Sequence, residues 1–321
     1  MNTNKSLTKT AKAAIILALT IVSCTHDSEV DELTTVELRL SSGVAVSTKA
    51  SFPGADTQIP NGEQIVVYVD ETGGAVQLYG NNSLTADGAG NLSGGTRMYF
   101  PANGNNIDIY ALHSNAALTA AYPTTALTHT VSGDQRTLAG YAPSDLLYAK
   151  RTNVARTASP VLLTFYHLLS KIQVAIMPGE GLAPADIAGI SIGGTRLQAQ
   201  FTLAKAANPD AVAITAAGTA APITIGADVS PNLTTNIQFN DAIIVPQTLA
   251  SGTALISIRL SDNTNLTYRL PENTTFESGK KYGYLITTNT NTSGDLTELI
   301  LETTIEDWLP TDYITGEATL E

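Results

Sequence analysis

The chain has 321 residues and a formal net charge of −12 at pH 7; 43% of its residues are hydrophobic and 14% are charged. This length and apolar content suffice for two domains of ordinary size and exclude a disordered acidic chain. The strong negative charge argues against nucleic acid as a partner and against electrostatic docking on anionic lipid. Abundant Thr, Asn, Gly and small apolar residues favour extended β-structure with many turns.

Residues 1–23 have the features of a lipoprotein signal peptide. A lysine-containing stretch leads into the apolar run 13–22, which is too short to span a bilayer. The run ends in Ile21-Val22-Ser23-Cys24, which is similar to a bacterial lipobox, so Cys24 is the predicted lipidation site. The alternative is an ordinary signal peptide with an incidental cysteine. Cys24 is the only cysteine, which excludes a disulfide within the chain, and residues 24–35 predict an acidic tether.

A first strand is predicted over residues 36–46, because apolar and polar residues alternate there. Ser42 is the small exception on the apolar phase. The apolar phase consists of Val36, Leu38, Leu40, Val44 and Val46. Lys49 in the loop that follows and Arg39 within the strand are candidate positions for trypsin-like cleavage. The alternative is that both are ordinary surface residues.

Further strand patterns, separated by turn signals, continue to residue 149. They cover residues 65–69, 75–79, 97–100 and 107–112, with a hairpin turn at Gly73-Gly74 and a short buried segment at 143–149. Residues 80–95 predict a long Gly/Asn loop, and 114–135 a surface excursion. The polar, basic connector 150–160 marks the predicted domain boundary, which divides the body into 36–155 and 156–321.

The stretch 162–177 stands between two prolines and alternates strictly from Ile172 onward. Its apolar residues on one phase and Lys171 and Gln173 on the other predict a half-buried strand. The apolar phase changes earlier in the stretch, so we expect a bulge or short turn near His167 to Ser170. A helix is the alternative, but the flanking prolines, the β-branched run and the absence of caps favour the strand.

Strand patterns then continue to the C-terminus. They cover 186–192, 196–203, 242–245, 254–260, 266–270, 282–288 and 296–304. In the last segment, 313–321, one phase carries Ile314, Gly316, Ala318 and Leu320. Such a terminal strand can add to its own sheet or to the sheet of a neighbouring subunit.

The sequence contains no pattern typical of an enzyme or a metal site. None of the four histidines has metal-ligand spacing to another His or to Cys, and no nucleophile or phosphate-loop motif is present. His167 is interpreted as a core or inter-strand hydrogen-bonding residue, and Asp145, Asp186 and Asp307 as turn or strand-end residues. We therefore expect no catalytic residue, no metal and no cofactor.

The pattern F-x-H-x-L-S-K-I-x-V at residues 165–174 resembles the signature of Bacteroidales fimbrillin-like lipoproteins, the major and minor fimbrial subunits of type V pili. The lipobox at Cys24 matches as well. The further matching pieces are 65–68, PSDLLYA at 143–149, FESGKKYGYLIT at 276–287 and IEDW at 305–308. The resemblance extends over nearly the whole chain.

This resemblance implies an all-β protein with two tandem β-sandwich domains of transthyretin-like topology, made as an outer membrane lipoprotein at the cell surface. In stalk subunits of the family an Arg-specific protease removes the N-terminal strand, and a neighbour's C-terminal segment fills the groove. Residues 36–46 would be the removable strand and 313–321 the donor. Lys49 departs from the pattern, because an Arg is expected at the cleavage position.

The leading hypothesis is therefore a structural fimbrial subunit that assembles by donor-strand exchange and supports adhesion, with other fimbrial subunits as partners. The alternative is a non-polymerising surface adhesin, or a tip or anchor subunit, that binds a host ligand or glycan through loops such as 80–95 or 114–135. A hydrolase on a β-sandwich has no supporting motif.

Overall fold

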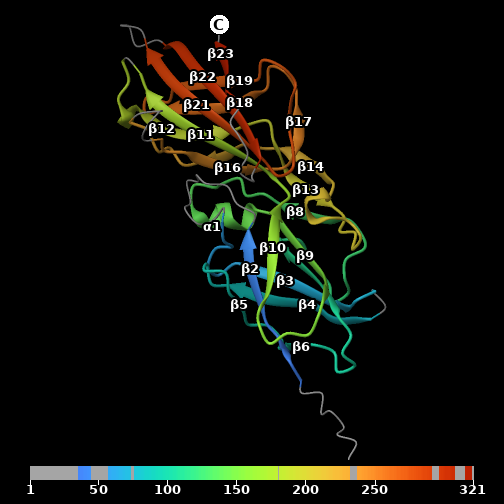
Figure 1. The fold of residues 1–321 in the computed structure, drawn as a ribbon. Helices are drawn as coiled ribbons and strands as arrows, with labels where there is room; N and C mark the ends of the chain where they lie inside the picture. The colour runs from blue at the N-terminus through green and yellow to red at the C-terminus, as the bar shows by residue number, and fades with distance from the viewer. Residues whose placement is uncertain are drawn as a thin grey trace, which may run out of the picture. The chain divides into compact units, whose positions relative to one another are not determined.

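The computed structural model describes residues 35–44, 57–73, 76–179, 181–231, 237–290, 296–307 and 315–319. The chain divides into two compact units, 1–34 and 35–321, so all of these residues belong to the second unit. Nearly all of the regular structure is β-strand (Figure 1), which confirms the predicted all-β class. The described part of the chain has no helix long and apolar enough to cross a membrane.

A seven-stranded sheet organises the N-terminal part. Its order is β2 (Leu40–Val44), β10 (Val161–His167), β9 (Leu147–Val154), β7 (Ile107–His113), β3 (Gln64–Glu71), β4 (Gln77–Ala86) and β5 (Leu92–Ser93). All neighbours are antiparallel except β2 and β10, which run parallel. A separate pair joins β1 (Glu37–Leu38) to β6 (Met98–Tyr99). The sheet's core includes Val67, Ile109 and Leu163, which are fully buried.

Two sheets form a sandwich in the C-terminal part. The five-stranded sheet has the order β16 (Asn240–Ile244), β11 (Ser170–Pro178), β21 (Lys280–Thr290), β22 (Leu296–Asp307) and β23 (Thr315–Thr319). The four-stranded sheet has the order β15 (Ile223–Ile225), β12 (Ile187–Ile192), β18 (Ala254–Leu260) and β19 (Asn265–Arg269). Val174 and Ile190 lie in one core, and the rings of Tyr268 and Tyr284 pack at a centroid distance of 5.8 Å. Apolar faces of two sheets thus share one interior.

Smaller elements complete the described chain. They are the sheet β14 (Ile214–Ala220), β13 (Arg196–Phe201) and β8 (Leu127–Thr130), the pair β17 (Gln247–Leu249) and β20 (Thr274–Phe276), the helix α1 (Leu138–Tyr141), and 3₁₀ turns at Ala142–Ser144, Pro184–Asp186 and Pro209–Ala211. The expected excursion 114–135 contains β8, which pairs with β13. The tyrosine-rich second face of the seven-stranded sheet is buried in the same core as Phe201 of β13.

The central stretch changes sheet between His167 and Ser170, which confirms the predicted turn there. The predicted half-buried character of the second strand is wrong. Every residue from Ser170 to Ile176 is buried, including Lys171 and Gln173. The reason is that β11 lies inside the sheet, between β16 and β21, and that the Asp241 carboxylate on β16 binds the side chains of both Lys171 and Gln173. The carboxylate lies 2.8 Å from Lys171 Nζ, and Gln173 Nε2 donates to it at 3.0 Å. A buried charge is tolerated when it is paired and hydrogen-bonded.

The predicted loop 80–95 is also wrong over most of its length. β4 extends to Ala86, and Leu92–Ser93 forms β5, so only the turn between them and Gly94-Gly95 lie outside strands. Leu84 and Ala86 are buried in the sheet's core. Glycines and asparagines here serve close packing and turns rather than a free loop. β10 lies beyond the proposed boundary at residue 155 and joins the first sheet, and the two-domain division itself stays a prediction.

Candidate functional site: the first strand in its groove

The predicted first strand is observed as β1 and β2, separated by Arg39. Val36 is half-buried, whereas Leu38, Leu40 and Val44 retain only 3%, 5% and 5% of their exposure. They belong to the core of the seven-stranded sheet, together with Phe100 and Phe165 as well as Met98. Full burial of such side chains contributes roughly 1.5–3 kcal/mol each. Val46 lies outside the described residues.

β2 lies beside β10 (Figure 1), and hydrogen bonds hold the first strand along both of its edges. On one edge, Leu40 to Val44 pair in parallel with Val161 to Phe165, and Val161 N donates to the Arg39 carbonyl at 2.8 Å. On the other edge, Ser42 N donates to the Gly90 carbonyl at 2.8 Å, and Ser41 bridges to Asn91. The strand therefore closes the gap between β10 and the turn before β5.

An open cleft of about 450 Å³ lies beside the first strand. One wall is formed by Glu37 to Leu40, and the other by Asn91 to Met98, with Leu84 and Pro160 also in the lining. Hydrogen bonds close the far edge of the strand at Ser41 and Ser42, and β1 pairs with β6 at Glu37 and Leu38. The cleft borders the first strand between these contacts.

Two glycines allow close packing around the cleft: Gly90 against Ser42 of the first strand, and Gly95 against Asn82 of β4. A methyl group placed on Gly90 (φ +94°) would lie 3.0 Å from the Ser42 carbonyl oxygen, and one placed on Gly95 (φ +67°) would lie 2.5 Å from Asn82 Oδ1. Asn82 in turn binds both the amide and the carbonyl of Thr96 at 2.8 Å. Positive φ and absent side chains are thus both required. In the sequence, the only sign of this wall is its closely spaced glycines, and the same pattern also predicts a loop.

The two candidate cleavage residues differ in their surroundings. Arg39 has an exposed side chain, but its guanidinium donates to the Ala158 carbonyl and its own carbonyl accepts from Val161. A protease binds an extended, unpaired segment of its substrate. The bond after Arg39 does not offer one, because Leu40 already belongs to β2. Lys49 lies outside the described residues, as does Cys24.

The C-terminal candidate strand is seen as β23, at the edge of the five-stranded sheet. It pairs antiparallel with β22, from Thr315 opposite Thr304 to Thr319 opposite Ile300. Gly316 and Ala318 lie within it, opposite Thr303 and Leu301. Ile314 and Leu320 fall outside the described residues. The segment thus adds to its own sheet here, which was one of the two expected arrangements.

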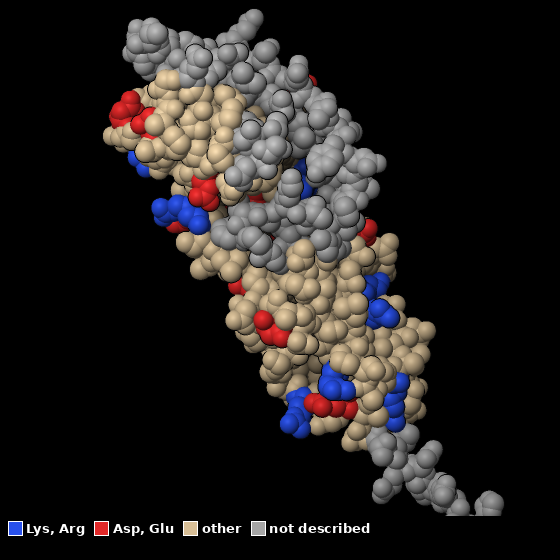
Figure 2. Space-filling model, turned by 60° about the vertical axis from the view of Figure 1, so that its left-hand side comes forward, with Lys and Arg blue, Asp and Glu red and all other residues tan. Residues whose placement is uncertain are grey.

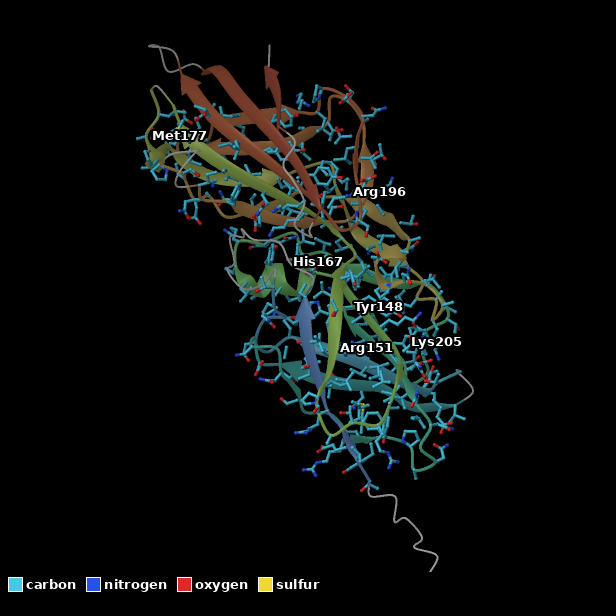
Figure 3. All side chains as sticks on the ribbon, viewed as in Figure 1. Tyr148, Arg151, His167, Met177, Arg196 and Lys205 are labelled. Carbon is cyan, nitrogen blue, oxygen red and sulfur yellow. The ribbon has the colours of Figure 1, made fainter. Side chains whose placement is uncertain are left out.

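Three histidines from different strands converge on the turn before β9 (Figure 3 labels His167). His113 Nδ1 contacts the Asp145 carbonyl at 2.7 Å, and His129 Nε2 contacts the Ser144 carbonyl at 2.9 Å. His167 Nδ1 lies 2.8 Å from the Asp145 carboxylate. All three side chains are buried. His167 is therefore a core residue bonded between segments, as predicted, and Asp145 ends the 3₁₀ turn.

Burial lowers the pKa of His129 to about 4, against the opposing effect of its bond to the Ser144 carbonyl. Its Nδ1 accepts from Ser114 Oγ at 3.0 Å, so the neutral ring has partners on both nitrogens. This group of histidines joins three strands to the turn before β9. Within the described ranges, no three or more His, Cys, Asp and Glu side chains are arranged to hold a metal ion.

Comparison with known proteins places the chain in a family. The family model described as "Fimbrillin-like" matches residues 48–308. Two solved structures with the same fold are each described as a "putative cell adhesion protein". The one from Bacteroides uniformis has a TM-score of 0.60 and 22% identity, over 85% of this chain and 98% of that chain. The one from Bacteroides ovatus has a TM-score of 0.59 and 18% identity, over 87% of this chain and 99% of that chain.

No curated protein matches the sequence. The structural likenesses, at these identities, establish a shared fold. The family match begins at residue 48, beyond β2, and ends at residue 308, so it includes the central stretch, the strand β22 and the described strands from β3 onward to it. Because it spans most of the 321 residues, the chain belongs to the fimbrillin-like family.

Proposed function

We propose that this protein is a structural subunit of a surface fimbria, which assembles by strand exchange after proteolysis removes its first strand. One observation carries the proposal. Residues 36–44 fill a groove with three buried apolar side chains. Only the segment between β2 and β3 joins these residues covalently to the strands that form the groove. Their partner strand β10 is more than a hundred residues away in the sequence. A single cut between 44 and 57 would leave the first strand held by non-covalent contacts alone.

Removal of the first strand would leave an open groove that another strand can fill. It would expose the core around Met98, Phe100 and Phe165 and unpair the edge of β10. An unpaired edge beside an apolar groove binds an added strand through main-chain hydrogen bonds and side-chain pockets. The C-terminal segment 313–321 supplies alternating apolar residues for this role. Figure 2 shows small, separate groups of charged residues on the described surface in that view.

The lipid anchor belongs to the same proposal. Lipidation at Cys24 would hold the precursor in the outer membrane, and the acidic residues 24–35 would separate the folded body from the bilayer. A cut after Lys49 would then release the anchor and the first strand together. This order of events couples departure from the membrane to opening of the groove.

Limited trypsin digestion of the chain without residues 1–23, followed by intact mass and electron microscopy, tests the proposal. We expect a cut after Lys49, survival of the bond after Arg39, and growth of filaments. The matched control is Lys49→Gln, which should remain uncut at this bond and monomeric. A chain that is cut there but stays monomeric at high concentration would refute the stalk role.

A second candidate is a subunit that does not polymerise, such as a tip, an anchor or an adhesin for a host ligand. The pairing of β23 with β22 favours it, because a C-terminal strand retained on its own sheet is not free to enter a neighbour. Lys49 in place of the expected Arg points the same way. Filaments that still grow after removal of residues 313–321 would exclude this segment as the donor, and retention of uncut monomer on a glycan array would support the adhesin.

A further inference from the structure

The buried face of the first strand contains one polar side chain. Ser42 lies between Leu40 and Val44 in the alternation and retains 5% of its exposure. Its hydroxyl has no hydrogen-bond partner among the described residues. A buried hydroxyl without a partner is unfavourable, because it loses its bonds to water and gains none in the protein. An apolar residue of the same size would avoid this loss.

The groove around position 42 is also tight. Ser42 N is bonded to the Gly90 carbonyl, and the Ser42 carbonyl would lie only 3.0 Å from a methyl group on Gly90. Gln58 Oε1, a second buried oxygen without a partner among the described residues, would lie 3.2 Å from the same methyl. The Ser42 carbonyl oxygen and the partnerless Gln58 Oε1 therefore both lie close to Gly90. Gly90 must stay without a side chain, whereas the partnerless Ser42 hydroxyl could be replaced by an apolar group of similar size without the loss of a hydrogen bond.

We propose that Ser42 makes the first strand a weak occupant of its own groove, so that the strand leaves more readily once it has been cut. The inference rests on the proposed strand exchange.

Amide hydrogen exchange on the uncut chain without residues 1–23 tests the weakness directly. The Val161 amide is bonded to the Arg39 carbonyl, so its exchange reports detachment of the first strand. In Ser42→Ala we expect protection of this amide to rise about tenfold, since an unsatisfied hydroxyl is removed. The matched control is Ser41→Ala, the same change on the opposite phase of the strand, which should leave protection unchanged. Equal protection in all three chains, or an equal rise in both variants, would overturn the proposal.

Filament growth after cleavage then tests the link to assembly. Ser42→Ala should slow growth about tenfold relative to the unsubstituted chain, because the displaced strand leaves less readily. Ser41→Ala should grow at the original rate. Raised protection with unchanged growth would overturn the role of Ser42 in exchange. The hydrogen-exchange measurement involves neither cleavage nor filaments. It can therefore be interpreted even if the proposed function is wrong.

Discussion

Lys205 forms an ion pair with Asp70, and its ammonium group lies 4.7 Å from the centre of the Tyr122 ring. Asp70 lies on β3 and is fully buried, whereas Lys205 comes from the segment between β13 and the 3₁₀ turn at residues 209–211. Tyr110 lies 5.4 Å from the same ammonium group. This contact fastens the connection after β13 to the seven-stranded sheet. The carboxylate depends on this contact, because Lys205 binds its Oδ2 and its Oδ1 has no hydrogen-bond partner among the described residues.

Substitution of Lys205 by Met should therefore destabilise the fold by about 3–5 kcal/mol, since it leaves a buried carboxylate unpaired. The double variant Lys205→Met with Asp70→Asn should recover a large part of this loss. Urea unfolding of the single and double variants measures the coupling. The control is Arg136→Met, which breaks an ion pair whose side chains are 60% and 55% exposed and should leave the free energy of unfolding nearly unchanged. Equal losses for Lys205→Met and Arg136→Met would show that the Asp70 pair is not buried in solution.

Acidification should destabilise the protein through His129. Its pKa is about 4 in the folded state and 6.5 for an unperturbed side chain, so the unfolded chain binds the proton more readily. Stability is therefore lost as the pH falls from about 6.5 towards 4, by on the order of 3 kcal/mol in total. His129→Gln should be less stable at pH 7, because it loses ring contacts, but should lose about that much less on acidification. Urea unfolding at pH 7, 5.5 and 4 measures both effects, and parallel pH profiles for the two chains would contradict this assignment.

Strands with one apolar face could be predicted from the sequence alone. The alternation at 36–44 correctly predicted the first strand, because a period of two in apolar residues reports burial on one side. The same reasoning failed at Lys171 and Gln173, since their burial depends on Asp241, 68 residues beyond Gln173. No local pattern reveals a distant partner that makes a polar face an interior one.

Only part of the candidate site could be predicted from the sequence. The buried face of the first strand could be deduced from its alternation, and the observed burial of Leu38, Leu40 and Val44 agrees with it. The groove that receives it could not, because its walls come from β10, β6 and the turn at Gly90. These segments meet only through long-range pairing. Ser42 stood out in the pattern as an exception, but its missing partner is a property of the three-dimensional packing.

The wall of the groove should be sensitive to Gly95. Gly95→Ala places a methyl group 2.5 Å from Asn82 Oδ1 and 2.6 Å from the Ser83 carbonyl, at a φ of +67°. Gly104→Ala is the matched control, with a φ of +78° and open space around the added methyl. Both variants pay about 1 kcal/mol for the backbone conformation, and we expect Gly95→Ala to lose a further 1–3 kcal/mol or so through overpacking. Thermal unfolding compares the stability of the two variants. Equal losses of stability would mean that the wall of the groove makes room for the added methyl group at no cost.

The clearest test of the first strand as part of the core compares two leucines on neighbouring strands. Leu40 on β2 is 5% exposed, whereas Leu162 on β10 is 50% exposed. Leu40→Ala in the uncut chain should cost about 2–5 kcal/mol in the free energy of unfolding, because it removes buried methyl groups and leaves a cavity. Leu162→Ala should cost no more than about 1 kcal/mol, because the side chain already contacts water. Urea denaturation of both variants gives the comparison. If Leu40→Ala cost no more than Leu162→Ala, the first strand would not be integral to the core, and its removal would create no groove for a donor to fill.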